Sequence, residues 1–192
     1  MIRALYDWTL SLASHRHATW ALAVVAFVES SVFPIPPDIL LIPMIVARPG
    51  RAFVLAGIAT LASVLGGLAG YLIGAFLFDA VGQPVLDFYG MAAEFDTFRQ
   101  TYNDWGAWAV LIAGVTPFPY KVITILSGAT GLSLPVFMLA SIVARGLRFF
   151  VLAALLWKFG APIRDFIERR LGLMFTLAVA LLLGGFYAVK FL

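Results

Sequence analysis

The stretch that decides the fold of this chain reads Phe27-Val-Glu29-Ser-Ser-Val-Phe33-Pro34-Ile-Pro36-Pro37-Asp38-Ile-Leu40. Proline lacks a backbone N–H and restricts the residue before it, so no continuous helix can run through this stretch. The flanking apolar arms, residues 18–33 and 38–47, are each too short at ~1.5 Å per residue to cross a ~30 Å hydrocarbon core comfortably. We therefore expect a re-entrant helical hairpin with Pro34, Pro36 and Pro37 at its tip. A single spanning helix kinked at these prolines is the alternative.

The composition of the whole chain is that of an integral membrane protein. Of its 192 residues, 62% are hydrophobic and only 12% are charged, and the mean hydropathy is +1.00. A soluble domain does not tolerate this balance, whereas a chain that spans a bilayer needs it. The net charge of +3 comes from basic residues scattered at the ends of apolar segments, so we expect no nucleic-acid partner. The chain has no cysteine, which excludes disulfides and thiolate metal sites.

The remaining sequence divides into segments of different character. Residues 1–17 suit an interfacial N-terminal helix, because their apolar side chains fall mostly on one helical face. Residues 52–78 are uncharged and exceed the ~20 residues that a spanning helix needs. Residues 79–104 are acidic and amphipathic and suit interfacial helices on the opposite side of the membrane. Two further spanning helices are expected, one at residues 132–157 and a C-terminal one at residues 171–192.

A second broken apolar segment lies in the other half of the chain. The arm at residues 105–115 is interrupted by Thr116-Pro117-Phe118-Pro119-Tyr120-Lys121, and residues 122–130 form the returning arm. By the same argument as above, Pro117 and Pro119 mark the tip of a second re-entrant hairpin.

The two halves of the chain match each other. The matching stretches are residues 33–38 with 116–121, 63–66 with 141–144, and 82–88 with 160–166. These matches define two repeats, residues 18–88 and 105–166. Each repeat contains one hairpin that does not cross the membrane and one helix that does, so the two repeats face opposite ways. The predicted fold is an all-α integral membrane protein with inverted repeats, an arrangement typical of transporters.

Glycines recur at a spacing of four in the first spanning segment. Gly66, Gly70 and Gly74 would lie on one face of its helix, where small residues allow another helix to approach closely. We favour packing within the chain. Packing between chains, which would make the protein a homo-oligomer, stays open.

Four stretches of this sequence together resemble one known family. They are Glu29-x4-Pro34-x-Pro36-Pro37-Asp38, Leu65-Gly66-Gly67-Leu68-x-x-Tyr71-x-x-Gly74, Thr116-Pro117-Phe118-Pro119-Tyr120-Lys121 and Arg145-Gly-Leu-Arg148-Phe149. They resemble the bacterial DedA proteins, which share the VTT (SNARE-associated Golgi protein) domain, and in particular the YqaA-like branch. The resemblance implies a VTT-like membrane domain over residues 18–170 in a multi-pass protein of the bacterial inner membrane.

The resemblance also implies a function. Proteins of this family are regarded as lipid transporters, flippases or scramblases, with undecaprenyl phosphate as one candidate lipid and protons as the coupling ion. The sequence departs from the family pattern at one place. Other branches carry Arg-x-x-Pro-x-x-Arg in the second hairpin, whereas Pro117 is flanked at those spacings by Gly114 and Tyr120. Lys121 is the one basic residue there.

Charged residues inside the apolar segments are the candidate transport residues. An ionised side chain at the bilayer centre costs roughly 2.5–3.5 kcal/mol, so these groups must face each other or a wet cavity. The candidates are Glu29, Asp38, Lys121, Arg145 and Arg148, with Thr116 as a polar neighbour. We expect the basic residues to bind the anionic headgroup of a membrane lipid, because guanidinium groups match phosphate geometry. Glu29 and Asp38 would exchange protons. Asp38 and Lys121 hold equivalent repeat positions, so a pseudo-two-fold axis would bring them together.

Three functions stay open from the sequence. Lipid transport is favoured; the alternatives are a proton- or cation-coupled exporter of small solutes, and a non-transporting scaffold whose charges are only structural ion pairs. We do not expect an enzyme, because His15 and His17 lie at a predicted water boundary and leave no histidine base at membrane depth. No His/Glu cluster has the spacing of a zinc site, so neither a metal nor a cofactor is expected.

Overall fold

The structure is a computed structural model that describes residues 17–32, 36–116 and 118–160. Every regular element in these ranges is helical, as expected for an all-α protein. The elements are α2 (Ala18–Ser31), α3 (Asp38–Ala47), the 3-10 turn η1 (Pro49–Arg51), α4 (Ala52–Leu77), the π-helical turn η2 (Phe78–Gly82), α5 (Gln83–Tyr89), α6 (Ala92–Val115), α7 (Tyr120–Ala129) and α8 (Leu134–Phe159). The helix predicted at residues 1–17, apart from His17, and the one predicted at residues 171–192 lie outside the described residues.

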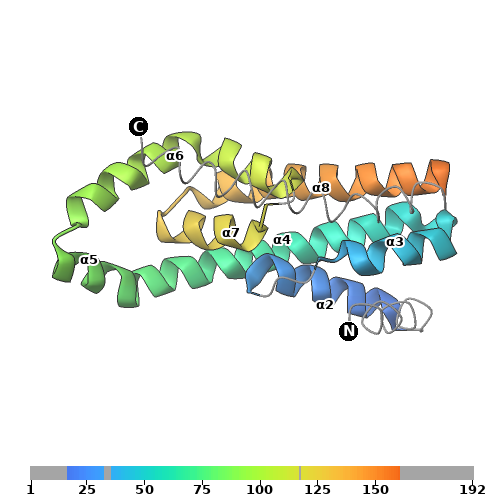
Figure 1. Ribbon diagram of the computed structural model, residues 1–192, viewed down its shortest axis with the longest axis horizontal. Helices are drawn as coiled ribbons and strands as arrows, with labels where there is room; N and C mark the ends of the chain where they lie inside the picture. The colour runs from blue at the N-terminus through green and yellow to red at the C-terminus, as the bar shows by residue number, and fades with distance from the viewer. Residues whose placement is uncertain (1–16, 33–35, 117, 161–192) are drawn as a thin grey trace.

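Both predicted helix breaks are present. Helix α2 ends at Ser31 and α3 begins directly after Pro37, while α7 begins directly after Pro119. A proline at this position costs no hydrogen bond, because the first N–H groups of a helix have no partner within it. Figure 1 shows α3 running back toward the end of the molecule where α2 begins, and α7 running opposite to α6. The chain thus forms two helical hairpins, each with a proline-containing turn.

Helix α4 is the central element. It packs against α2, α3, α7 and α8, and its glycines allow two of these contacts to be very close. A Cβ atom on Gly66 would overlap the backbone of Phe27 in α2, and one on Gly74 would overlap the backbone of Ile125 in α7. The prediction that these glycines serve packing within the chain is therefore confirmed.

The acidic region after α4 differs from the prediction. Helix α4 (Ala52–Leu77) ends within one residue of the predicted spanning segment 52–78, and the chain continues in helical conformation through η2 and α5. Helix α6, however, runs unbroken through the expected boundary between Asp104 and Trp105. The chain reverses only at Gly90, which has a φ of 68° and ends α5. A change from acidic to apolar composition does not end a helix, whereas a glycine in the left-handed conformation does. The predicted boundary between residues 104 and 105 is therefore wrong, whereas the one at residue 78 agrees with the end of α4.

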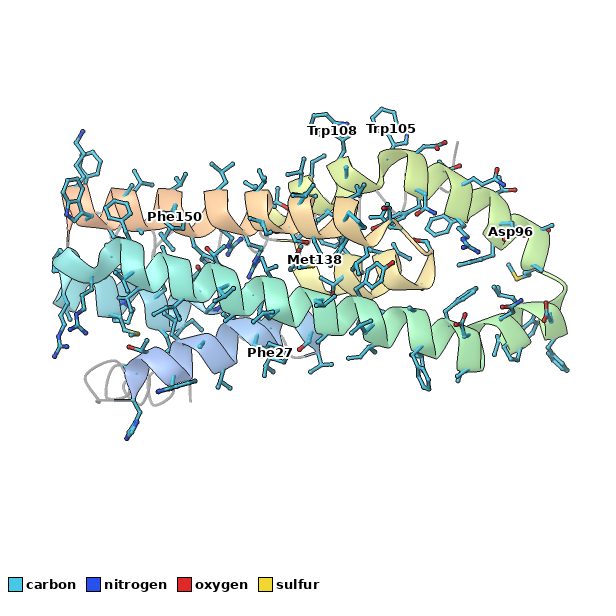
Figure 2. All side chains as sticks on the ribbon, turned by 180° about the vertical axis from the view of Figure 1, so that it is seen from behind. Phe27, Asp96, Trp105, Trp108, Met138 and Phe150 are labelled. Atoms are coloured by element: carbon cyan, nitrogen blue, oxygen red, sulfur yellow. The ribbon has the colours of Figure 1, made fainter. Side chains whose placement is uncertain are left out.

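Two helical stretches in the described part of the chain are long and apolar enough to cross a membrane, Pro49–Tyr89 and Leu134–Phe159. Large apolar side chains also point outward. Figure 2 shows Trp105 and Trp108 projecting from α6, where they are 66% and 60% exposed. A soluble protein rarely leaves so many large apolar side chains in water. The structure is consistent with the membrane protein that the composition predicts.

Candidate functional site

Arg145 lies near the middle of α8 and points into the protein. Only 2% of its surface is exposed. Its Nη2 donates to Glu29 Oε2 at 2.6 Å, and its Nε donates to Ser63 Oγ at 2.5 Å. The guanidinium carbon is 4.8 Å from the ring centroids of both Tyr120 and Phe149, which is cation–π distance. This arginine is therefore surrounded by groups from α2, α4, α7 and α8.

Ser30 and Ser63 complete a closed ring of hydrogen bonds with the ion pair between Arg145 and Glu29. Ser30 Oγ donates to Glu29 Oε2 at 3.0 Å and lies 2.7 Å from Ser63 Oγ. Hydrogen bonds therefore connect Arg145 with Ser63, Ser63 with Ser30, and Ser30 with Glu29. The bond that Arg145 donates to Glu29 closes the ring. Buried polar groups are stable only when they have such partners, and networks of this kind fix one arrangement of the helices. We call these four residues the arginine–serine ring.

Arg148, one helical turn further along α8, forms a separate ion pair. Its Nη2 donates to Asp38 Oδ2 at 2.5 Å, and its Nη1 donates to the backbone carbonyl of Thr116 at 3.0 Å. The Arg148 side chain is 23% exposed and the Asp38 side chain 8%. The second carboxylate oxygen, Asp38 Oδ1, is buried and has no hydrogen-bond partner among the residues that the structure describes. This pair joins the turns of both hairpins to α8.

The two remaining candidates, Lys121 and Thr116, contact the site through backbone carbonyl groups. Lys121 Nζ donates to the backbone carbonyl of Val32 at 3.3 Å and forms no ion pair with the described residues. It thus reaches the first hairpin but not Asp38, because that carboxylate is paired with Arg148 instead. Thr116 contributes its backbone carbonyl to Arg148. Asp38 and Lys121 therefore form no ion pair with each other, although the Lys121–Val32 contact shows that the two hairpin turns meet.

The prolines at the hairpin turns occupy distinct environments. Pro37 is fully buried at the start of α3, whereas Pro36 and Pro119 are exposed. Pro34 and Pro117 lie outside the described residues.

Several polar and aromatic residues of the site were not predicted. They are Ser30, Ser63, Tyr120, Ser141 and Phe149. Tyr120 donates from its hydroxyl to Ser141 Oγ at 2.5 Å, in a buried contact between α7 and α8. One signal was available, because Ser63 and Ser141 align in the internal repeat and both turn out to accept a hydrogen bond from a site residue.

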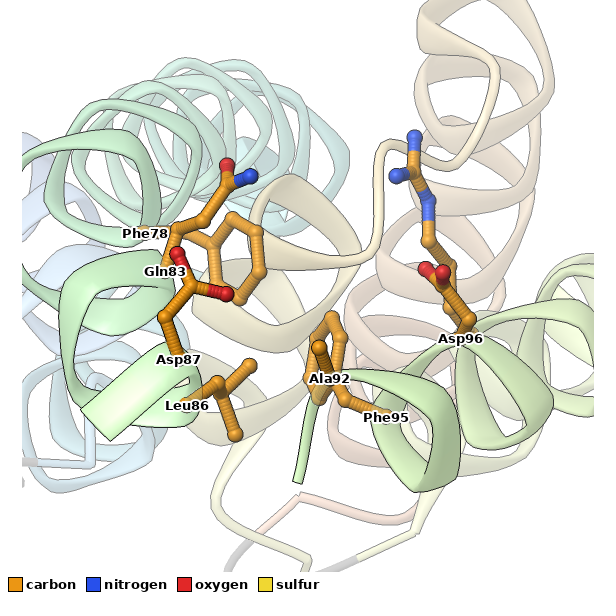
Figure 3. Close-up of a pocket in the computed structure, with 8 residues that line it drawn as sticks. Phe78, Gln83, Leu86, Asp87, Ala92, Phe95 and Asp96 are labelled. Carbon is orange, nitrogen blue, oxygen red and sulfur yellow. The ribbon is translucent and has the colours of Figure 1, made fainter. Parts of the chain in front are cut away.

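A pocket lies elsewhere, between α5 and the start of α6. Figure 3 shows Asp87 and Asp96 on either side of it, with Phe78 and Phe95 between them, and the two rings stack at 4.7 Å between centroids. None of the predicted site residues lines it. The described part of the chain contains no group of three or more His, Cys, Asp or Glu side chains that could hold a metal ion.

Comparison with known proteins identifies the family. The VTT domain model matches residues 35–158, which includes four of the five charged candidates and runs from α3 into α8. An uncharacterized protein of Haemophilus influenzae is 38% identical over 168 residues, covering 85% of this chain and 87% of that protein. An uncharacterized protein of Histophilus somni is 39% identical over 168 residues, with the same two shares. No solved structure matches the chain. The chain belongs to the VTT domain (DedA) family, whose members are membrane proteins of transporter type and generally not enzymes.

Proposed function

We propose that this protein moves a phosphate-bearing lipid across the bacterial inner membrane, as a transporter or scramblase. The observation that carries the proposal is the pair of arginine–carboxylate contacts in the middle of an apolar helix of spanning length. Arg145 and Arg148 are the twelfth and fifteenth of the 26 residues of α8. Ionisable groups at that depth are costly and mark substrate or ion pathways in membrane proteins.

The hairpins support the same proposal. Helices α2, α3 and α7 have 14, 10 and 10 residues, which is fewer than the ~20 that a spanning helix needs. In the proposed multi-pass arrangement α2 and α3 form one re-entrant hairpin, and α7 forms the other with the apolar second half of the 24-residue helix α6. The two hairpins, one in each inverted repeat, enter from opposite sides of the membrane. Broken helices that meet near the midplane are how many transporters build a binding site.

The charges have the chemistry that a phosphate headgroup requires. Arg148 presents a planar set of donors that matches phosphate geometry, and Lys121 adds a cation on the second hairpin. Asp38 and Glu29 are carboxylates that exchange protons in the proposed mechanism, which would couple lipid movement to the proton gradient.

Translocation of fluorescent lipids in proteoliposomes tests the proposal. Arg148→Lys should reduce transport tenfold or more, because a single ammonium cannot bond Asp38 Oδ2 and the Thr116 carbonyl as the guanidinium fork does. Asp38→Asn should still fold but lose the pH dependence of transport, because an amide does not titrate. Protein level and thermal stability of each variant serve as controls.

A double variant distinguishes the proposal from a purely structural ion pair. Removing one partner of a structural buried pair costs ~3–5 kcal/mol, because the other charge is left alone. Asp38→Leu combined with Arg148→Met removes both charges and should restore folding while abolishing transport. A double variant that regains transport as well as folding would show that the charges are only structural.

A further inference from the structure

We propose that the two arginines have different tasks. Arg148 and Asp38 contact the lipid headgroup, Arg145 positions the helices, and the headgroup carries an N–H or O–H donor next to its anionic oxygen. This inference rests on the proposed function and adds the chemistry of its ligand.

The Arg145 pair leaves little room for a ligand. Its guanidinium is almost fully buried, and aromatic rings lie within cation–π distance of it. Its Nε and Nη2 are taken up by the arginine–serine ring, and Glu29 Oε2 already accepts from two donors, Arg145 and Ser30. The hydrogen bonds of the described residues leave Nη1 of Arg145 unused, but only 2% of this residue is exposed, so a headgroup phosphate could reach it only by displacing the side chains packed around it. We therefore assign Arg145 as a positioning residue.

The ion pair between Arg148 and Asp38 is more accessible, because the Arg148 side chain is more exposed than that of Arg145. About a quarter of the Arg148 side chain is exposed, and one of its two protein partners is a backbone carbonyl in the turn before α7. No aromatic ring of the described residues lies over its guanidinium at cation–π distance. A guanidinium has five N–H donors, of which the two hydrogen bonds to Asp38 and Thr116 use two. Arg148 can therefore bind an anionic oxygen without losing either protein contact.

Asp38 Oδ1 indicates what else the ligand contains. This oxygen is buried and no group of the described residues donates to it, whereas a buried carboxylate oxygen needs an N–H or O–H donor. Pro36 and Pro37, which directly precede Asp38, have no backbone N–H that could donate to it. A ligand that places an anionic oxygen on Arg148 and a donor on Asp38 Oδ1 would satisfy both groups at once.

Two kinds of phospholipid headgroup carry this combination. A phosphate monoester has a P–OH beside its charged oxygens, and a phosphoethanolamine headgroup has ammonium N–H groups. A phosphocholine headgroup has the same phosphate and the same net charge as phosphoethanolamine but no donor. The inference therefore predicts selection against phosphocholine.

Binding of short-chain lipids tests this prediction. The full chain in neutral detergent is titrated calorimetrically with dihexanoyl phosphatidic acid, phosphatidylethanolamine and phosphatidylcholine. A hydrogen bond to a charged group corresponds to roughly ten- to hundredfold in affinity, so at least one of the first two lipids should bind about tenfold more tightly than phosphatidylcholine. The lipid that does so identifies the source of the donor.

Matched variants assign the preference to one carboxylate. Asp38→Asn and Glu29→Gln each convert an arginine-paired carboxylate into an amide. Asp38→Asn should abolish the preference over phosphatidylcholine, whereas Glu29→Gln should lower thermal stability and keep the preference. Phosphatidic acid also carries more negative charge than phosphatidylcholine, and charge alone could make it bind more tightly. A preference for phosphatidic acid therefore supports the inference only if Asp38→Asn loses this preference and Glu29→Gln keeps it.

The inference and the proposed function can fail separately. Equal affinity of the wild-type protein for all three lipids, or equal loss of preference in both variants, would overturn the inference. The wild-type comparison decides the matter even if Asp38→Asn does not fold. Selective binding without lipid translocation in proteoliposomes would instead refute the proposed function and leave the inference standing.

Discussion

Replacing Gly74 by alanine should loosen the contact between α4 and α7. A Cβ atom at this position would lie 2.7 Å from the carbonyl carbon and 2.9 Å from the Cα of Ile125, and would overlap the carbonyl oxygen. All three are backbone atoms, so no side-chain rotation can relieve the overlap. The contact is reciprocal, because a Cβ on Gly128 of α7 would overlap the backbone of Tyr71 in α4.

The size of the effect follows from the overlap. Carbon atoms in contact are normally ~3.5–4.0 Å apart, so the two helices would have to separate by about 1 Å. Overpacking of this kind costs typically ~1–3 kcal/mol. Gly57 provides a matched control in the same helix, because a Cβ there meets nothing within 4 Å. Gly57→Ala should hold or raise stability, since alanine is a better helix former than glycine by ~0.8–1.0 kcal/mol.

Thermal unfolding in detergent, followed by circular dichroism, measures the difference. The two variants should differ by about 1–3 kcal/mol, which is the overpacking cost at Gly74, because both substitutions gain the same helix propensity. Equal unfolding midpoints for Gly74→Ala and Gly57→Ala would contradict the close contact between α4 and α7. A lowered unfolding midpoint for Gly57→Ala, with that of Gly74→Ala unchanged, would show that the close helix contact lies at Gly57 and not at Gly74.

Two further predictions concern the long helical stretch and the end of α7. The chain has no cysteine, so Gly50→Cys and Ala93→Cys, both at exposed positions, can be labelled with a membrane-impermeant thiol reagent in intact and opened cells. They should react from opposite sides of the membrane, and labelling from the same side would exclude the topology proposed for Pro49–Tyr89. Arg99→Ala should cost roughly 1 kcal/mol in the same unfolding assay, because Arg99 Nε donates to the Thr130 carbonyl at 2.8 Å. Unchanged stability would show that this bond is not formed.

The hairpins could be predicted from sequence because their cause is local. Proline removes a backbone donor and restricts the residue before it, and Pro37 and Pro119 directly precede α3 and α7. A single proline does not suffice, because Pro43 lies inside α3 without ending it. The continuity of α6 through Asp104 could not be predicted in the same way. Acidic composition indicates where a segment meets solvent, but it does not interrupt the backbone hydrogen bonds of a helix.

The partners within the site were harder to predict than its location. The cost of burying charge required the arginines and carboxylates to meet, and they do. Repeat symmetry could not decide that Asp38 would pair with Arg148 and not with Lys121, because it aligns positions along the chain and not side chains in space. Ser63 was missed for another reason. A serine in an apolar helix usually bonds its own backbone, as Ser31 does with the Phe27 carbonyl, and the two cases look alike in sequence.

The arginine–serine ring also has a fixed polarity. Arginine can only donate hydrogen bonds and an ionised glutamate can only accept them, so the Ser63 and Ser30 hydroxyls must both orient from Arg145 toward Glu29. Both hydrogen bonds that reach Glu29 end on the same atom, Oε2, so this one oxygen is the acceptor on which the whole ring depends. The attachment of α2 to α4 and α8 through the ring thus rests on a single carboxylate oxygen.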